Sequence, residues 1–273
     1  MAYCYFNGKI VDMRKASVRP NDLGLLRGYG VFEYLRTYNG KLFLLEEHLA
    51  RFQNSAKLLN LKIPIGEKEL VRVIKRLIAK NKLAETGIKL VLTGGPTHDG
   101  ITYSHRSNTF YILAEPPPFY PKTLYEKGAK LITCEYHREL PLIKTTNYIA
   151  FLRMQKKRKK EKVVEVLYVK DGLISECSRS NFFIFKGNTL ITPTGDVLPG
   201  ATRGFIIRLA KKAKFKVVER PLRFNELKQA SEAFLTSTDR EIMPVVKVDK
   251  LTIASGQVGE NTKQLMQLFK NLF

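Results

Sequence analysis

Residues 140–148 read Leu-Pro-Leu-Ile-Lys-Thr-Thr-Asn-Tyr and place Lys144 directly after an apolar run. An amine beside Leu140, Leu142 and Ile143 is expected to be partly desolvated. Desolvation lowers the pKa of a lysine and makes the neutral amine available as a nucleophile for Schiff-base chemistry. On these residues alone the alternative is an exposed lysine at the end of a strand, because most lysines are exposed.

A carboxylate follows in a small polar stretch. Glu176 lies in the segment Gly-Leu-Ile-Ser-Glu-Cys-Ser-Arg-Ser-Asn at residues 172–181. A lysine and a carboxylate can together hold the two ends of a pyridinium cofactor. The two stretches therefore indicate an enzyme.

Length and composition indicate a folded protein of the cytoplasm. The 273 residues are enough for one large or two moderate domains, and 44% of them are hydrophobic. The first residues show no basic leader followed by an apolar stretch, and no uncharged segment is long enough to span a bilayer. We therefore expect a soluble cytoplasmic protein without a membrane partner.

The spacing of cysteines and histidines argues against a metal site. The three cysteines are far apart, and no two of the four histidines are separated by four residues, as two ligands on one helix face would be. We expect reduced cysteines and no metal.

The net charge of +22 results from 47 basic and 25 acidic residues. Such a charge attracts nucleic acid, anionic membranes or anionic metabolites without choosing among them. The densest basic runs, residues 156–162 and 211–216, lack the interleaved aromatic side chains of a base-stacking surface. We interpret them as solvated helix faces and expect no nucleic-acid partner. A basic nucleic-acid-binding protein remains the alternative from another functional class.

Hydrophobic periodicity predicts a sheet with two helices in the first part of the chain. An Asn-Gly pair at residues 7–8 is typical of a hairpin turn, and residues 31–38 alternate like a half-buried strand. Apolar residues recur at helical spacing in residues 46–59 and 66–82. The predicted strands are residues 3–6, 9–12, 31–38, 41–44, 87–92 and 108–114.

Residues 115–121 contain four prolines and are interpreted as a stiff interdomain linker, because proline donates no backbone hydrogen bond. This gives a first domain at residues 1–114 and a second at residues 122–273. In the second half, strands are predicted at residues 130–134, 164–169, 180–186 and 189–191, and helices at residues 148–160 and 202–213. The predicted architecture is α+β with two domains.

Two further segments could bind an anion. In Leu-Pro-Gly-Ala-Thr-Arg at residues 198–203, a glycine turn opens a helix whose first amides, with the Thr202 hydroxyl, suit a phosphate. Thr-Ser-Thr at residues 236–238 offers hydroxyls and amides at a strand end. An ordinary helix cap and an ordinary turn remain the alternatives.

In their order and spacing these motifs resemble those of the class IV fold-type pyridoxal phosphate aminotransferases, which include D-amino acid aminotransferase, branched-chain aminotransferase and aminodeoxychorismate lyase. The resemblance covers almost the whole chain. It rests on Val31–Glu33, Glu47–Phe52, Lys144, Glu176 with Ser180–Phe183, Leu198–Arg203, and Thr236–Thr238 with Glu241–Val245. It implies a fold-type IV enzyme with a small N-terminal α/β domain and a larger C-terminal domain that has a β-barrel-like core.

The resemblance also implies roles for the matching residues. Lys144 would form the Schiff base with pyridoxal 5′-phosphate and then move the proton between substrate and cofactor. Glu176 would keep the pyridine nitrogen protonated. Arg51, otherwise a surface cation on an amphipathic helix, would contact the cofactor phosphate. The remaining cofactor-binding residues would be Ala201, Thr202, Ser237 and Thr238.

The motifs match two groups of the family that act on different substrates. Lys144 and Asn147 have the spacing of D-amino acid aminotransferases and lyases, whereas Phe32 and Tyr148 match the branched-chain group. Phe32 and Tyr148 are expected to line the substrate site.

The arginine and histidine that usually bind the carboxylate of D-amino acids are replaced by Gly94 and Pro96. We therefore expect Arg27 and Lys89 to supply the cations for the substrate carboxylates. An exposed loop arginine and an exposed strand lysine are the alternatives.

The predicted reaction transfers the amino group of an amino acid, with D-amino acids preferred, to a 2-oxo acid such as 2-oxoglutarate. The alternatives are transamination of branched-chain L-amino acids and elimination of pyruvate from aminodeoxychorismate. Relatives in this family are homodimers, so the resemblance implies a homodimer.

Overall fold

The computed structural model describes residues 2–273 and divides into two compact units. The first comprises the described residues up to Pro118 together with Ile143–Asn147, and the second comprises Phe119–Leu142 and Tyr148–Phe273. The short segment that carries Lys144 thus returns to the first unit after the chain has entered the second. The linker and boundaries inferred from proline content do not include this return.

The first unit is built on a six-stranded sheet in the order β2-β1-β6-β5-β3-β4, with every neighbouring pair antiparallel. Its strands are β1 (Tyr3–Phe6), β2 (Lys9–Asp12), β3 (Gly30–Tyr38), β4 (Lys41–Leu42), β5 (Gly87–Thr93) and β6 (Thr109–Glu115). The predicted hairpin at residues 7–8 is confirmed, and both turn residues have the positive φ that such a turn requires.

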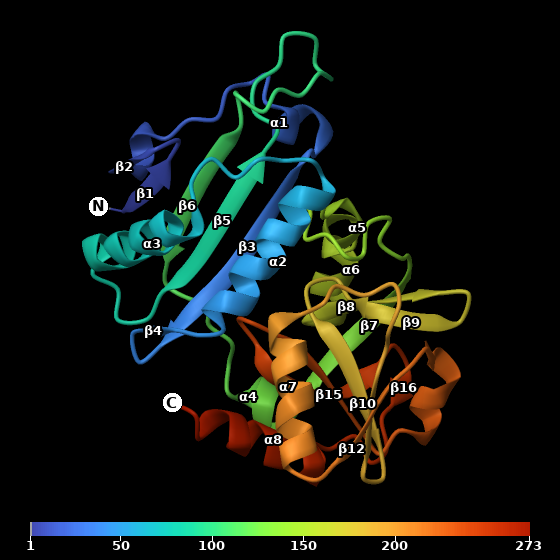
Figure 1. Cartoon of the computed structure of the whole chain (residues 1–273). Coiled ribbons are helices and arrows are strands. Elements are labelled where there is room, and N and C mark those ends of the chain that lie inside the picture. Colours follow the sequence, from blue (N-terminus) through green and yellow to red (C-terminus); the bar gives the residue numbers. More distant parts are fainter. Residues whose placement is uncertain (1) are drawn as a thin grey trace. The chain divides into compact units, whose positions relative to one another are not determined.

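Helices α2 (Leu45–Leu58) and α3 (Glu67–Asn81) cover one face of this sheet (Figure 1). Further helical elements are η1 (Met13–Lys15) and α1 (Leu23–Arg27). The apolar residues of α2 and α3 recur at helical spacing and pack with the inward residues of β3, β5 and β6 in one core. Both predicted helices are confirmed within one residue at each end.

The alternation of β3 separates the two faces of the sheet. Val31, Glu33 and Leu35 are fully buried, whereas Phe32 and Tyr34 are only partly buried. Since neighbours in an antiparallel pair share a face, the register of β3 with β5 puts Lys89 on the same face as Phe32. One face is therefore core beneath the helices, and the other carries two of the predicted substrate residues.

The second unit is built on a ten-stranded mixed sheet, in which β16 pairs with β15 outside the main path β12-β11-β10-β14-β15-β7-β8-β9-β13. Its strands are β7 (Ala129–Glu135), β8 (Glu165–Lys170), β9 (Leu173–Cys177), β10 (Asn181–Lys186), β11 (Thr189–Thr192), β12 (Lys216–Glu219), β13 (Leu222–Arg223), β14 (Glu232–Ser237), β15 (Glu241–Val248) and β16 (Leu251–Thr252). Its helices are α4 (Thr123–Glu126), α5 (Ile149–Arg153), α6 (Gln155–Glu161), α7 (Ala201–Lys212), η2 (Phe224–Gln229) and α8 (Glu260–Lys270).

The curled sheet encloses an apolar core, which confirms the expected β-barrel-like core as a half-barrel. The central strand β10 is buried on both faces: Phe182 and Ile184 belong to the enclosed core, while Phe183 stacks on Phe234 with 4.8 Å between ring centroids. On its outer face the sheet packs against α7 and α8, which also contact each other (Figure 1). The α+β class is confirmed.

One prediction of local structure was wrong, and strand β9 was not predicted. The helix expected at residues 148–160 is two short helices, α5 and α6, separated at Met154. The lysine-rich α6 has no buried residue, so no apolar face extends the first helix into the second. The polar stretch around Glu176 is in fact the strand β9. An available signal was the Asp171-Gly172 pair, whose positive φ angles fit the turn between β8 and β9.

Among residues 2–273, no helix is both long enough and apolar enough to cross a membrane.

Candidate active site

The backbone of Lys144 is fixed against the sheet of the first unit. Lys144 N donates to Ser55 Oγ of α2 at 3.2 Å, and its carbonyl accepts from Phe32 N at 2.9 Å. Thr145 forms an antiparallel bridge with Val31, and Thr146 N donates to the Gly30 carbonyl. The segment that carries Lys144 thus lies beside β3 like a short added strand, so the lysine starts from a rigid position.

The apolar run before Lys144 does not shield it as expected. Leu140 and Leu142 are 46% and 52% exposed, and only Ile143 is buried in the core of the first unit. The expectation that this run desolvates the amine was therefore wrong for two of its three members. The apolar neighbour is instead Phe32, whose ring centroid lies 4.4 Å from Lys144 Nζ.

Arg51 belongs to a buried cluster with Glu33 and His48. Arg51 Nε donates to Glu33 Oε2 at 2.8 Å and Arg51 Nη2 donates to Glu33 Oε1 at 2.6 Å. His48 Nδ1 lies 3.0 Å from the same Oε1. The Arg51 side chain is only 8% exposed, so it is not the surface cation that the helix pattern alone suggests. The two-point contact fixes the plane of its guanidinium group.

The contacts within this cluster shift the pKa values of Glu33 and His48. Burial acts to raise the pKa of Glu33, but Arg51 and His48 outweigh it and hold that pKa well below its ordinary value. Burial lowers the pKa of His48 more than Glu33 raises it, so His48 is neutral at pH 7. A signal for this cluster was available, because Glu33 occupies an inward position of an alternating strand.

In the second unit, Glu176 is tied to the segment before α7. Glu176 Oε2 accepts from Leu198 N at 3.1 Å and from Asn181 Nδ2 at 3.2 Å, and Asn181 Nδ2 also donates to the Leu198 carbonyl at 2.9 Å. The Glu176 side chain is 5% exposed. These bonds link β9, β10 and the start of α7, and sequence reasoning did not foresee the contribution of Asn181.

Helix α7 begins as predicted, with Gly200 as its N-cap and Ala201 and Thr202 as its first buried residues. No side chain caps this end. A Cβ atom at Gly200 would lie 2.0 Å from Asn181 Oδ1, so any larger residue there would displace the Asn181 side chain. The first amides of a helix have no partner within it and carry the positive end of its dipole, which suits an anion.

The hydroxyls at residues 236–238 are engaged differently from expectation. Ser237 Oγ donates to Asp239 Oδ1 at 2.6 Å and accepts from Arg240 N at 3.2 Å. Because the single hydroxyl proton of Ser237 goes to Asp239, its side chain has no proton left for a phosphate. A contribution of Ser237 to anion binding would have to come from its backbone. Thr238 is half-buried at the turn that follows β14.

Sequence reasoning also missed Arg138, which lies between β7 and α5 in the second unit. Arg138 Nε is 3.4 Å from Glu176 Oε1, and its guanidinium carbon lies 5.7 Å from the ring centroid of Tyr148. The Arg138 side chain is only 11% exposed. A buried arginine beside a buried carboxylate is a paired charge, not a surface cation.

The two predicted carboxylate-binding cations have different surroundings. Arg27 is the last residue of α1, is exposed, and donates from Nη1 to the carbonyl of Leu26 at 3.0 Å. Lys89 is half-buried on β5, on the same sheet face as Phe32. In the described part of the chain, no hydrogen bond or ion pair joins Arg27 to Lys89.

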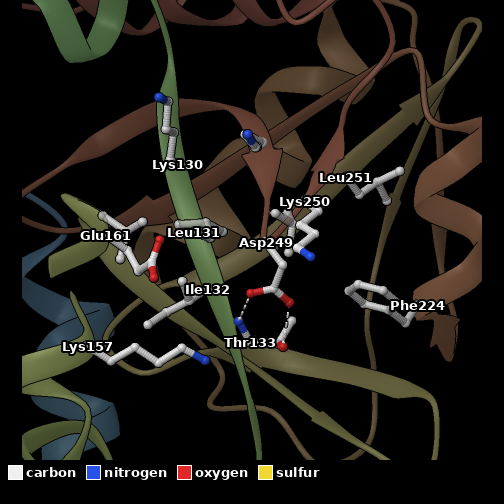
Figure 2. Close-up of a pocket in the computed structure, with 13 residues that line it drawn as sticks. Lys130, Leu131, Ile132, Thr133, Lys157, Glu161, Phe224, Asp249, Lys250 and Leu251 are labelled. Carbon is white, nitrogen blue, oxygen red and sulfur yellow. Dashed lines mark hydrogen bonds between the residues drawn. The ribbon is translucent and has the colours of Figure 1, made fainter.

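A separate groove of about 680 Å³ lies in the second unit and contains none of the predicted site residues (Figure 2). Its floor includes Leu131 and Ile132, and exposed lysines stand around it. Thr133 donates from N and Oγ1 to the two oxygens of Asp249, at 3.0 and 2.6 Å. The groove is an open basic surface, which agrees with the interpretation of the lysine-rich helix as solvated.

The predicted cofactor residues have the chemistry that pyridoxal 5′-phosphate requires, although they are divided between the units. The first unit holds an amine, Lys144, and a guanidinium fixed in its plane, Arg51. The second unit holds a buried carboxylate, Glu176, and a glycine-opened helix start before Thr202. These match an aldehyde, a phosphate and a pyridine nitrogen.

Relatives of known name cover nearly the whole chain. A Methanocaldococcus jannaschii protein provisionally named a branched-chain-amino-acid aminotransferase is 36% identical over 98% of this chain and 95% of its own length. D-alanine aminotransferase of Bacillus licheniformis is 31% identical over 97% of this chain and 95% of its own length. The solved branched-chain amino acid aminotransferase of Escherichia coli is 30% identical, with a TM-score of 0.93 over 100% of this chain and 94% of that chain.

The profile of the amino-transferase class IV family matches residues 30–248, which span β3 to the end of β15. Members of this family are aminotransferases that use pyridoxal 5′-phosphate. The chain belongs to the class IV aminotransferases and is an enzyme that depends on this cofactor.

Proposed function

We propose that this enzyme transfers the amino group of a D-amino acid to a 2-oxo acid such as 2-oxoglutarate, with Lys144 as its catalytic residue. The main support is the position of Lys144, whose N–H and C=O are both bonded while Nζ lies beside the Phe32 ring. A lysine with a fixed backbone and a long side chain can bring its amine first to the substrate carbon and then to the cofactor carbon.

Pyridoxal phosphate, when bound, supplies an electron sink that stabilises negative charge at the substrate α-carbon. Lys144 Nζ takes the proton from the substrate α-carbon and passes it to the carbon of the cofactor that receives the amino group. Glu176 keeps a proton on the pyridine nitrogen. Arg51, oriented by Glu33, and the first amides of α7 at Ala201 and Thr202 hold the phosphate.

The half-reactions test this proposal. Purified enzyme loaded with pyridoxal phosphate should lose its visible absorption band when it is mixed with amino donors, and the screen runs D- and L-amino acids separately. Bleaching by D-amino acids alone supports the proposal. Bleaching by branched-chain L-amino acids alone contradicts the choice of substrate, and release of pyruvate from aminodeoxychorismate contradicts transamination.

Branched-chain L-amino acids are the second candidate. Relatives with names of both kinds are similar to this chain, and Phe32 presents an apolar ring on the face of the sheet that also carries Lys89. An apolar ring favours an aliphatic substrate side chain.

Arg27 and Lys89 are proposed to bind the substrate carboxylates. Each charged hydrogen bond contributes about 1.5–3 kcal/mol, so Arg27→Ala or Lys89→Ala should raise the Michaelis constant for the amino donor roughly 10- to 100-fold. Cofactor affinity should change less than about twofold. Arg14→Ala, which removes an exposed arginine on η1, is the control. Equal losses of substrate and cofactor affinity would contradict this role.

We also propose that the enzyme is a homodimer. The first unit exposes large apolar side chains, with Leu25 at 64%, Leu26 at 41% and Ile101 at 71% exposure. Exposed apolar side chains close in space mark interfaces, and a Cβ atom at Gly100 would lie 4.0 Å from Leu26. Sedimentation equilibrium of the native enzyme and of Leu26→Asp with Ile101→Asp tests this, and a monomeric native enzyme would contradict it.

A further inference from the structure

We infer that Arg138 is a positioning residue that keeps Glu176 ionised and correctly oriented for the pyridine nitrogen of the cofactor. The inference rests on the role proposed for Glu176 and adds a residue that no motif indicated. The hydrogen bonds and the ion pair described above for the Glu176 carboxylate lie within the second unit.

The two oxygens of Glu176 have different neighbours. Oε2 accepts from the neutral donors Leu198 N and Asn181 Nδ2, at 3.1 and 3.2 Å. Oε1 lies 3.4 Å from Nε of the Arg138 cation. Neutral donors fix the direction of a carboxylate, while a nearby cation compensates the free energy that its negative charge loses on burial.

Two further titratable groups of this unit, Tyr148 and Cys177, lie near Glu176. Tyr148 and Cys177 both interact with its charge, and burial raises the pKa of each above its ordinary value. Burial acts to lower the pKa of Arg138, but the Glu176 carboxylate, together with Tyr148 and Tyr168, outweighs burial and raises that pKa. Arg138 therefore stays protonated and forms an ion pair with Glu176.

The position of Arg138 also depends on the pair. Its side chain is 11% exposed and lies against the Tyr148 ring, and Nη1 is buried without a hydrogen-bond partner among the described residues. A guanidinium group desolvated to this degree is stabilised chiefly by an opposite charge. The carboxylate and the cation thus hold each other in place between β9 and the segment that follows β7.

This pairing has a measurable consequence. A protonated Glu176 cannot make a charge-assisted bond to a protonated pyridine nitrogen, so cofactor affinity falls as the pH drops and Glu176 takes up a proton. Without Arg138 the carboxylate is easier to protonate. The loss of affinity then begins at a higher pH.

The test measures binding of pyridoxamine 5′-phosphate by calorimetry between pH 4 and 9, because this form makes no covalent bond to Lys144. In Arg138→Gln the fall in affinity should move upward by at least about one pH unit, which is a tenfold change in the protonation equilibrium. Arg138→Lys keeps a positive charge and should shift the pH at which affinity falls by a smaller amount. Arg220→Gln removes an arginine that pairs with Glu226, and it should leave the pH profile unchanged.

A double-mutant cycle separates positioning from a merely structural role. Glu176→Gln should leave only the part of the pH-dependent fall that comes from the cofactor phosphate, whose second pKa is about 6. Adding Arg138→Gln to it should change affinity by less than about twofold. An unshifted profile in Arg138→Gln, or an equal loss of affinity with and without Glu176, would overturn the inference. If Glu176→Gln binds like the native enzyme, the proposed role of Glu176 fails and the inference fails with it.

Discussion

Glu33 and Glu176 are both buried carboxylates, but the two units of the enzyme hold them in different ways. Glu33 makes two short bonds to Arg51 and one to His48. Glu176 accepts two longer bonds from neutral nitrogens and has its cation at 3.4 Å. The first arrangement is a two-point ion pair, whereas in the second the bonds to neutral nitrogens and the ion pair involve different oxygens of the carboxylate. Glu33 thus orients Arg51, the residue proposed to bind the phosphate, and Glu176 is the carboxylate proposed to act on the cofactor itself.

The largest effect should come from Lys144, the reactive group that the first-unit scaffold supports. Lys144→Ala should lower turnover at least about a thousandfold, because it removes both the tether and the base. Thermal unfolding should hardly change, since the backbone bonds of Lys144 remain. Amino-donor turnover and the melting temperature measure the two effects, with Lys57→Ala on the exposed face of α2 as control. Turnover that persists in Lys144→Ala would exclude Lys144 as the catalytic residue.

The next largest effect should be on the free energy of unfolding, which should fall more in Glu33→Gln than in Glu176→Gln. Glu33→Gln leaves the Arg51 charge buried and should cost about 3–5 kcal/mol of unfolding free energy. Glu176→Gln keeps its neutral donors nearby and should cost about 1–2 kcal/mol. Denaturant titration measures both.

Glu69→Gln breaks an exposed pair with Arg72 on α3 and should change stability by less than about 0.5 kcal/mol, so it serves as the control. If Glu176→Gln proves as destabilising as Glu33→Gln, the distinction between scaffold and functional carboxylate is wrong.

Gly200, the N-cap of α7, and Gly204 in its first turns should differ in their effect on cofactor binding. Gly200→Ala should weaken pyridoxamine 5′-phosphate binding about tenfold, because the new Cβ displaces Asn181 and with it Glu176. Gly204→Ala meets only Arg208 Nη1 at 3.7 Å and should instead stabilise the helix by about 0.5–1 kcal/mol. Similar binding by the two variants would show that the Asn181 contact is unimportant.

The smallest effect is the response of the first unit to acid. The pKa values of His48 and Glu33 are both lowered from their ordinary values of 6.5 and 4.5. Each group therefore contributes stability above its ordinary pKa that is lost as the pH falls towards its folded value. Unfolding free energy should decline below pH 6.5 through His48 and further below pH 4.5 through Glu33, by at most about 1.4 kcal/mol per pH unit for each group. In Glu33→Gln, the decline below pH 4.5 should shrink.

Elements that depend on neighbouring residues could be predicted from the sequence. The hairpin at residues 7–8 needs only an Asn-Gly turn between alternating strands, and α2 and α3 need only an apolar stripe. The start of α7 was predicted because glycine and proline mark it locally. Strand β9 was missed because five residues of mixed polarity carry little periodic signal.

The candidate site was predictable in its members but not in their partners. Lys144, Arg51 and Glu176 were found because their motifs resemble those of a known family. The contact of Arg51 with Glu33, the bond from Asn181 to Glu176 and the engagement of Ser237 by Asp239 join residues that must first be brought together by strand register and helix packing.

The sequence by itself determined the residue types of the proposed site, the sheet and two helices of the first unit, and the family, because these follow from local spacing and motif order. Only the tertiary structure decided that Ile143–Asn147 rejoins the first unit and that Glu33 faces α2 while Phe32 faces away. It also decided that Arg138 stands beside Glu176. The physical reason is that burial and charge pairing depend on distances between segments far apart in the chain, which no local pattern encodes.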